Sequence, residues 1–204
     1  MQFVYSQATY EQMYHRGQHK LHCRAPAEVL AEWEKKGYRG RAQTVWRAMP
    51  ITIQGVVLEV ACHHGKMAVW MLEAFPGIAQ MHMFDFSSVA VEHCKRIRRE
   101  RARMKIWQGD VSNIPVADNT YDFINCTDVT EHLPPKVYQQ MLKELSRVLK
   151  PYGHLLLLQG TTRLPEHIHI LPEAQLLADF KQHGFNHVCK LPRRHHLLAL
   201  PGAQ

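Results

Sequence analysis

The sequence predicts a single α/β domain built around a mainly parallel sheet. From about Gly55 onward, short apolar runs alternate with longer amphipathic segments, which is the pattern of repeated βαβ units. The first run, residues 56–60, is rich in valine and suits a strand that is buried on both faces. The chain closes with two strand-like runs separated by Pro192, Arg193 and Arg194, and this arrangement predicts a terminal hairpin.

Local signals predict each element of this pattern in chain order. Five strands alternating with helices are expected at residues 56–60, 80–84, 104–108, 121–126 and 154–158, and two hairpin strands at 187–190 and 196–200. Helices are expected at residues 66–74, 89–101, 135–149 and 172–183. The third of these helices has apolar residues at helical spacing and stops before Pro151, and Gly184 ends the fourth.

Residues 1–50 differ from the rest of the chain, because polar, aromatic and basic residues are interleaved there. We expect one or two helices in this segment, which forms an N-terminal helical cap (1–50) ahead of the main domain (51–204). Its aromatic and basic residues recur at a helix-like spacing: Tyr5, Tyr10, Tyr14, His15, Arg16 and His19. Such a face either closes over a substrate or packs the segment against the sheet.

Composition places the chain among ordinary globular proteins. Of its 204 residues, 46% are hydrophobic and 21% are charged. No apolar run approaches the roughly 18 residues of a membrane span, and the first residues lack the order of a secretory signal, so we expect a cytoplasmic protein without a membrane span. The formal net charge of +7 admits an anionic partner such as nucleic acid, but the basic run 95–103 more simply predicts the solvated face of a helix.

Four motifs lie where predicted strands begin or end, and open α/β sheets carry their sites at the carboxyl ends of the strands. VLEVACHHG combines Glu59 with a loop closed by Gly65; such a loop lets backbone amides approach a ligand, and the next helix directs its positive end at an anionic group. MHMFDFSS ends its strand at Asp85, whose carboxylate offers two acceptors to a vicinal diol but can also cap the next helix. The others are GDVSNIPVADNTYDFI, around Asp110, and LKELSRVLKPYGHLLL, in which Gly153 makes a turn.

In this order, the four motifs resemble those of the class I S-adenosylmethionine-dependent methyltransferase superfamily, most closely its small-molecule branch similar to ubiquinone/menaquinone-biosynthesis methyltransferases. The resemblance covers residues 56–158 and, more loosely, the terminal hairpin. It implies a Rossmann-like class I methyltransferase fold, α/β, with a seven-stranded mainly parallel sheet and a C-terminal antiparallel hairpin. It also implies S-adenosyl-L-methionine as the cofactor and methyl transfer to a small-molecule acceptor.

The resemblance further implies roles for single residues. Glu59 bears on the methionine amino end of the cofactor, Asp85 on the two ribose hydroxyls, and Asp110 lies near the adenine amino group. His63 departs from the family pattern, because a bulky side chain replaces a glycine at a point of close approach. Asp122, in the turn that enters the fourth strand, is expected to be structural. The cofactor-binding set implied in this way is Glu59, Ala61, His63, Gly65, Asp85, Phe86, Asp110, Val111, Cys126 and Thr127.

The segment after the fourth strand, residues 125–132, must face the methyl acceptor. It lacks the Asn/Asp-Pro-Pro-Tyr/Phe pattern of amino-directed DNA and protein-glutamine methyltransferases, which argues against those substrates. Asp128 and His132 are the candidate catalytic residues, since either can take a proton from an oxygen or nitrogen nucleophile. His132 can equally pack in the loop, and transfer from a sulfonium needs chiefly alignment and desolvation.

Two features leave other functions open. The positive charge favours an RNA-modifying methyltransferase, and His63 favours a catalytically degenerate homologue that binds the cofactor or a partner. No metal is expected, because the pairs His63-His64 and His167-x-His169 lack a third ligand. Acceptor choice is expected to depend on the N-terminal segment and on residues 160–171, and the sequence does not indicate the oligomeric state.

Overall fold

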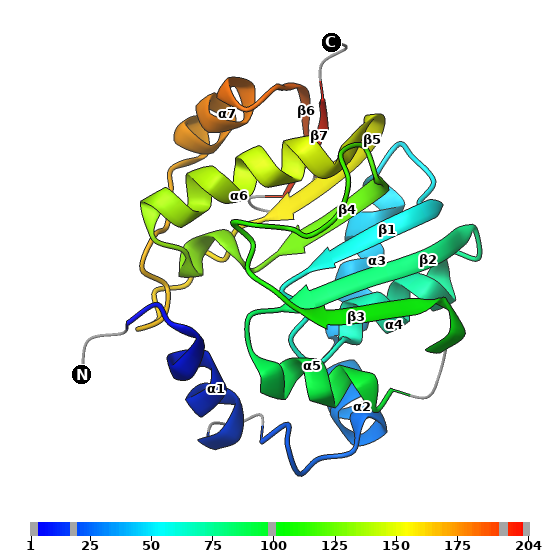
Figure 1. The fold of residues 1–204 in the computed structure, drawn as a ribbon. Coiled ribbons are helices and arrows are strands. Elements are labelled where there is room, and N and C mark those ends of the chain that lie inside the picture. The colour runs from blue at the N-terminus through cyan, green and yellow to red at the C-terminus, as the bar shows by residue number, and fades with distance from the viewer. Residues whose placement is uncertain (1–3, 17–19, 98–100, 192–195, 202–204) are drawn as a thin grey trace.

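The computed structural model describes residues 4–16, 20–97, 101–191 and 196–201, and these form one seven-stranded sheet in the order β3-β2-β1-β4-β5-β7-β6 (Figure 1). β1 to β5 pair in parallel, whereas β7 runs antiparallel to both β5 and β6. The predicted mainly parallel sheet with a terminal antiparallel hairpin is thereby confirmed, and the turn predicted at 192–194 lies outside the described residues. The strands are β1 Gly55–Val60, β2 Ile78–Asp85, β3 Met104–Gln108, β4 Tyr121–Thr127, β5 Leu149–Leu158, β6 Phe185–Lys190 and β7 His196–Pro201.

Helices cover both faces of the sheet, with α6 and α7 on one face and α3, α4 and α5 on the other (Figure 1). Successive residues of β1 alternate between the two cores, so that Leu58 packs with α6 and Val57 with α4. The N-terminal segment holds three helices rather than one or two, because Gly37, in the left-handed region (φ 75°), separates α2 from α3. Within the described residues, none of the helices has both the length and the apolar character needed to span a membrane. The helices are α1 Gln7–Arg16, α2 Pro26–Lys35, α3 Tyr38–Ala48, α4 Lys66–Ala74, α5 Ser88–Lys95, α6 Pro135–Val148 and α7 Glu173–Gln182, with short 3₁₀ turns η1 Arg101–Arg103 and η2 Thr130–His132.

α5 is shorter than the helix predicted over residues 89–101. It begins after Ser87, whose hydroxyl accepts a hydrogen bond from the backbone amide of Val89 (3.2 Å), and it ends at Lys95. The predicted length was wrong because Ile97 is buried, with 3% of its surface exposed, in the core beneath the sheet. The chain leaves the helix to bring this side chain inward.

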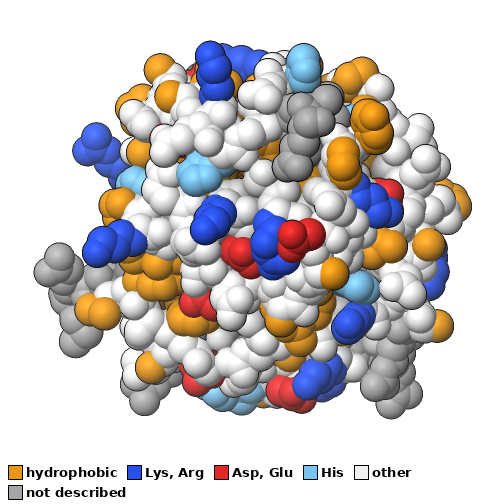
Figure 2. All heavy atoms as spheres, turned by 45° about the horizontal axis from the view of Figure 1, so that its top comes forward, with side chains coloured by type: hydrophobic (Ala, Val, Ile, Leu, Met, Phe, Trp, Pro, Cys, Tyr) orange, Lys and Arg blue, Asp and Glu red, His pale blue; other side chains and the backbone are white. Residues whose placement is uncertain are grey.

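The basic run 95–103 is therefore not one solvated helix face. Arg96 and Arg103 both donate hydrogen bonds to backbone carbonyls of neighbouring segments, so these guanidinium groups hold the fold together. Residues 98–100 lie outside the described part of the chain. On the face seen in Figure 2, Lys and Arg side chains lie among acidic, hydrophobic and uncharged ones rather than in one continuous patch.

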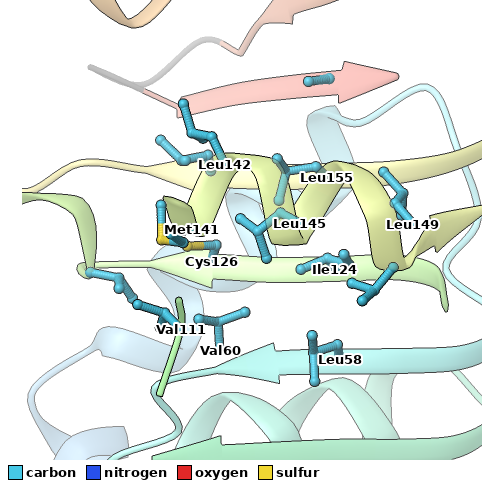
Figure 3. Close-up of a cluster of buried hydrophobic side chains, with 14 of the residues drawn as sticks. Leu58, Val60, Val111, Ile124, Cys126, Met141, Leu142, Leu145, Leu149 and Leu155 are labelled. Atoms are coloured by element: carbon cyan, nitrogen blue, oxygen red, sulfur yellow. The ribbon is translucent and has the colours of Figure 1, made fainter. Parts of the chain in front are cut away.

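One hydrophobic core lies between the sheet and α6 (Figure 3). The spacing of three and four residues places the apolar side chains of this helix on a single stripe. That stripe meets Ile124 and Cys126 from β4 and Leu155 from β5. Complete burial of each such side chain contributes about 1.5–3 kcal/mol, so the stripe anchors the connection from β4 to α6. The α6 residues with no exposed surface are Tyr138, Met141, Leu142, Leu145 and Val148.

Asp122 ties the starts of β1 and β5 to β4, as the structural role predicted for it requires. Its carboxylate accepts hydrogen bonds from the backbone amide of Val56 and from Lys150 Nζ, both at 2.8 Å. A Cβ at Gly55 would overlap this carboxylate, and Gly55 also has a positive φ of 75°. Glycine is therefore required at the beginning of β1 for two independent reasons.

We expect Leu145→Ala to lower the free energy of unfolding by about 2–5 kcal/mol, because it removes buried methyl groups and leaves a cavity. Leu177→Ala on α7 is the matched control: Leu177 is 38% exposed, and its truncation should change stability by about 0.5 kcal/mol or less. Urea denaturation of both variants measures the difference. Equal losses in the two would show that the α6 stripe does not carry the core.

Candidate active site

A cavity of about 550 Å³ lies at the carboxyl edge of the parallel strands. It is lined by the ends of β1, β2 and β4, by the loop after β3, by the N-terminal helices and by the segment between β5 and α7. In Figure 1 the arrowheads of β1, β2 and β4 point toward the side on which α1 and the segment after β5 lie. This edge is where open α/β sheets bind their ligands.

Most of the residues predicted to bind the cofactor meet in the wall of this cavity, but three do not. Cys126 is fully buried and points into the core beneath α6, because side chains alternate between faces along β4. Gly65 lies behind the wall, close to Ile97. Asp110 Oδ1 instead accepts hydrogen bonds from Ser112, from both N and Oγ at 2.7 Å. The predicted residues that do line the cavity are Glu59, Ala61, His63, Asp85, Phe86, Val111 and Thr127, together with Asp128 and His132.

The loop after β1 adopts the positive φ angles typical of a glycine-rich loop, although two of the three residues concerned are not glycine. Ala61 and His63 have positive φ angles of 52° and 50°, like Gly65 at 78°. This conformation costs a non-glycine residue roughly 1–2 kcal/mol. The His63 ring stacks on Tyr14 of α1 and on the neighbouring His64, with ring centres 4.8 and 4.4 Å apart. These stacking contacts offset the strain and give the bulky side chain a defined place in the wall.

Glu59 is a carboxyl group buried in the cavity wall, with 3% of its surface exposed. Asn125 Nδ2 donates a hydrogen bond to Glu59 Oε2 (2.8 Å). Burial raises the pKa of Glu59 to about 8, and the hydrogen bond from Asn125 and the charge of Lys66 oppose this rise. At pH 7 the carboxyl is therefore mostly protonated until a cationic group approaches it.

Lys66 is a cavity residue that sequence reasoning missed. It is the first residue of α4, and its ammonium lies 4.1 Å from the centre of the Trp33 ring. Burial lowers the pKa of Lys66, against the opposing charges of Asp128 and Glu59. The helix dipole disfavours a cation at the start of a helix, so the position of Lys66 directly after the loop was a sequence signal for an anionic ligand.

Asp85 ends β2 and holds the loop after β1 in place. Its Oδ2 accepts a hydrogen bond from the backbone amide of His63 (2.8 Å), and its Oδ1 accepts one from the amide of Ser87 (2.9 Å). Burial raises the pKa of Asp85 to about 6, and the backbone amides oppose the rise. Ser87, rather than Asp85, caps α5, so the carboxylate remains part of the cavity wall.

Three N-terminal tyrosines line the cavity: Tyr5, just before α1, and Tyr10 and Tyr14 within it. The rings of Tyr5 and Tyr14 stack on Phe86 and His63, with centres 5.4 and 4.8 Å apart. The Tyr10 ring lies between the other two, 6.0 Å from that of Tyr5 and 6.4 Å from that of Tyr14. α1 therefore covers residues from the ends of both β1 and β2. Of the other residues predicted to share this face, His15 is exposed. The Arg16 side chain and His19 lie outside the described part of the chain.

The other wall carries Asp128 and His132 beyond the end of β4. Asp128 is exposed, whereas burial and the neighbouring His167 lower the pKa of His132 to about 4. Its imidazole is therefore neutral at pH 7 but is a weak base. Burial also raises the pKa of Glu131 to about 7. Sequence reasoning paired His167 with His169, but the structure places its ring 4.7 Å from that of His132.

The fold and the carboxylates at the strand ends agree with the resemblance to class I methyltransferases. Residues 57–153 match the family model described as "Methyltransferase domain". This part of the chain is therefore similar to a methyltransferase domain.

Relatives and a solved structure agree with this assignment. The demethylmenaquinone methyltransferase of Staphylococcus saprophyticus is 28% identical over 131 residues, which are 64% of this chain and 54% of the relative. The fatty-acid O-methyltransferase of Mycolicibacterium smegmatis is 31% identical over 122 residues, 59% of this chain and 43% of the relative. The chain thus spans about half the length of the curated relatives it matches. Human N-acetylserotonin methyltransferase, solved with S-adenosylmethionine, has the same fold, with a TM-score of 0.69 at 14% identity over 95% of this chain and 59% of that one.

We expect the wild type to lose stability relative to Glu59→Gln as the pH rises from about 5 to about 8. The pKa of Glu59 is raised from 4.5 to about 8 on folding. The protonated carboxyl therefore contributes its full stabilisation below pH 4.5, and this stabilisation is lost as the pH rises through about 8. The difference should be on the order of 3 kcal/mol. Denaturant titrations of both proteins at several pH values measure it, and parallel curves would mean that Glu59 ionises normally.

Proposed function

We propose that this protein transfers the methyl group of S-adenosyl-L-methionine to a small-molecule acceptor. The observation that carries the proposal is the pair of buried carboxyl groups, Glu59 and Asp85, which line one cavity from the ends of adjacent strands. Buried groups with strongly shifted pKa values in a cleft are typical of functional sites.

The residues of the cavity fit the chemical groups of this cofactor. Its volume of about 550 Å³ is that of an ordinary small-molecule site. Glu59 complements a cationic amino group, Lys66 at the start of α4 complements a carboxylate, and Asp85 complements a ribose diol. Phe86 and Val111 offer apolar surface to an adenine ring. When bound, S-adenosylmethionine supplies a methyl group on a sulfonium, and its transfer breaks the C–S bond and leaves the electron pair on sulfur.

The chain's own residues favour a transfer that depends on alignment and desolvation. Tyr5, Tyr10 and Tyr14 line the cavity, and their rings would exclude water from a bound sulfonium. Asp128 and His132 face the acceptor from beyond β4, but His132, with a pKa of about 4, is too weak a base to remove a proton efficiently at pH 7. We therefore assign these two residues to acceptor positioning.

We further propose a largely apolar acceptor. Aromatic and aliphatic side chains dominate the cavity wall contributed by α2, α3 and β5: Trp33, Tyr38, Val45, Trp46, Leu156 and Leu158. The names of the relatives include a menaquinone precursor and a fatty acid as substrates, which are molecules of this kind.

We expect Asp85→Asn to weaken the binding of S-adenosylhomocysteine about ten- to hundredfold, because the amide replaces a charged double acceptor. Asp118→Asn is the control, since Asp118 is an exposed surface residue paired with Arg147. Isothermal titration calorimetry measures both, and a thermal melt verifies folding. Equal affinities in wild type and Asp85→Asn would overturn the ribose assignment.

Turnover is tested with methyl-labelled S-adenosylmethionine and three acceptors: a demethylmenaquinone, a long-chain fatty acid and total RNA. We expect label in one of the apolar acceptors and none in RNA. Labelled RNA, together with RNA binding that falls steeply with salt, would show that the acceptor is a nucleic acid and not a small molecule. Calorimetric binding without turnover on any acceptor would instead favour the degenerate homologue.

A further inference from the structure

We propose that Glu131, His132 and His167 form a binding site for one divalent transition-metal ion at the acceptor side of the cavity. The site itself rests on the geometry of these side chains, whereas a role for the ion in methyl transfer rests on the proposed function.

The three residues converge from two segments of the chain. Glu131 and His132 belong to η2, after β4, and His167 lies between β5 and α7. Their potential ligand atoms, one from each side chain, lie within 4.8 Å of one another, and all three residues line the cavity. Ligand atoms about 2.1 Å from a shared ion are at most about 4 Å apart, so small side-chain rotations close the remaining gap.

The hydrogen bonds around the site leave a lone pair on each imidazole. His167 Nδ1 lies 2.6 Å from the carbonyl oxygen of Thr162 and must donate to it, which leaves Nε2 as the atom with a lone pair. His132 hydrogen-bonds the backbone of Glu166, and its buried Nδ1 has no hydrogen-bond partner within the described part of the chain. A ring that donates one N–H to a carbonyl and offers its other nitrogen is the usual arrangement of a metal-ligating histidine.

The backbone holds the carboxylate and the second histidine together. The amide of Gly160 donates to Glu131 Oε1 (2.9 Å), and the amide of His169 donates to the Glu131 carbonyl oxygen (3.0 Å). A Cβ at Gly160 would overlap the Glu131 carboxylate and come within 3.3 Å of His167 Cε1. Glycine is therefore needed for the segment after β5 to pass this close to η2.

Other histidine pairs do not form a comparable group. The rings of His15 and His22 lie 4.7 Å apart, but in the ranges that the structure describes only the Glu131 cluster brings three potential ligands together. Two imidazoles and one carboxylate suit Zn²⁺, Fe²⁺ or Mn²⁺ better than Mg²⁺ or Ca²⁺, which prefer oxygen ligands. Three protein ligands also leave positions open toward the cavity.

Such an ion would act on an acceptor that carries a hydroxyl group. Coordination lowers the pKa of the hydroxyl, so that its proton passes to water and the oxygen becomes the nucleophile. His132 then serves as a ligand of the ion and not as the base.

The test uses the whole 204-residue chain, stripped with a chelator and titrated with ZnCl₂ by calorimetry. We expect one site per chain, and His167→Ala should lower its affinity by at least about a hundredfold, more than the loss of an outer partner causes. His15→Ala, which alters the exposed histidine pair, is the control and should leave the affinity unchanged. Gly160→Ala should weaken Zn²⁺ binding through displacement of Glu131.

Co²⁺ substitution gives a second readout, because its visible absorption reports the ligands, and His132→Ala should change that spectrum. S-adenosylhomocysteine affinity is measured for the same variants and should be retained in His167→Ala. If the wild type binds S-adenosylhomocysteine but neither Zn²⁺ nor Co²⁺, or if His15→Ala alone removes the metal, the inference is wrong and the proposed function stands. If Zn²⁺ binds as expected but S-adenosylhomocysteine does not, the metal site stands and the proposed function fails.

Discussion

The parallel pairing of β1 with β2 on one side and with β4 on the other holds the carboxyl ends of three strands at the same edge of the sheet. The register places Glu59 beside Met83 of β2 and Asn125 of β4, so that Asp85, two residues further along β2, lies at the same edge. Side chains of β1 are buried on both faces, so a slip of one residue would exchange them between two cores of different shape. The positions of the residues that line the cavity therefore depend on the packing of the whole sheet.

That edge concentrates groups that are unfavourable for folding. Glu59 and Asp85 are buried carboxyl groups with raised pKa values, and the positive φ angles of Ala61 and His63 add backbone strain. A protein selected for stability alone would place neutral side chains and glycines at these positions. A ligand group of positive charge would stabilise the buried carboxylates. The features that destabilise the free protein therefore favour a binding role.

The side of the cavity that carries Asp128 and His132 is organised differently, because it is built on connections rather than on strands. η2 and the segment after β5 meet through Gly160 and the backbone of Glu131, while the buried stripe of α6 anchors the end of η2. The N-terminal tyrosines close the cavity from the opposite side, through contacts with Phe86 and His63. Under the proposed function, cofactor binding depends on the sheet edge, and acceptor choice depends on three segments that are far apart in sequence.

Local patterns in the sequence were sufficient to predict the strands and helices of the sheet, the structural role of Asp122 and the position of Glu59 and Asp85 at strand ends, because periodicity and turn residues report these features directly. They were insufficient wherever the outcome depends on packing between distant segments. α5 stops at Lys95 because Ile97 is needed in the core that α4 and α5 cover. Cys126 faces the other core, beneath α6, instead of the cavity because side chains alternate along β4. His167 meets Glu131 and His132 only because the segment after β5 packs against η2. This contact depends on backbone hydrogen bonds between segments that are distant in the sequence, so residue spacing does not predict it.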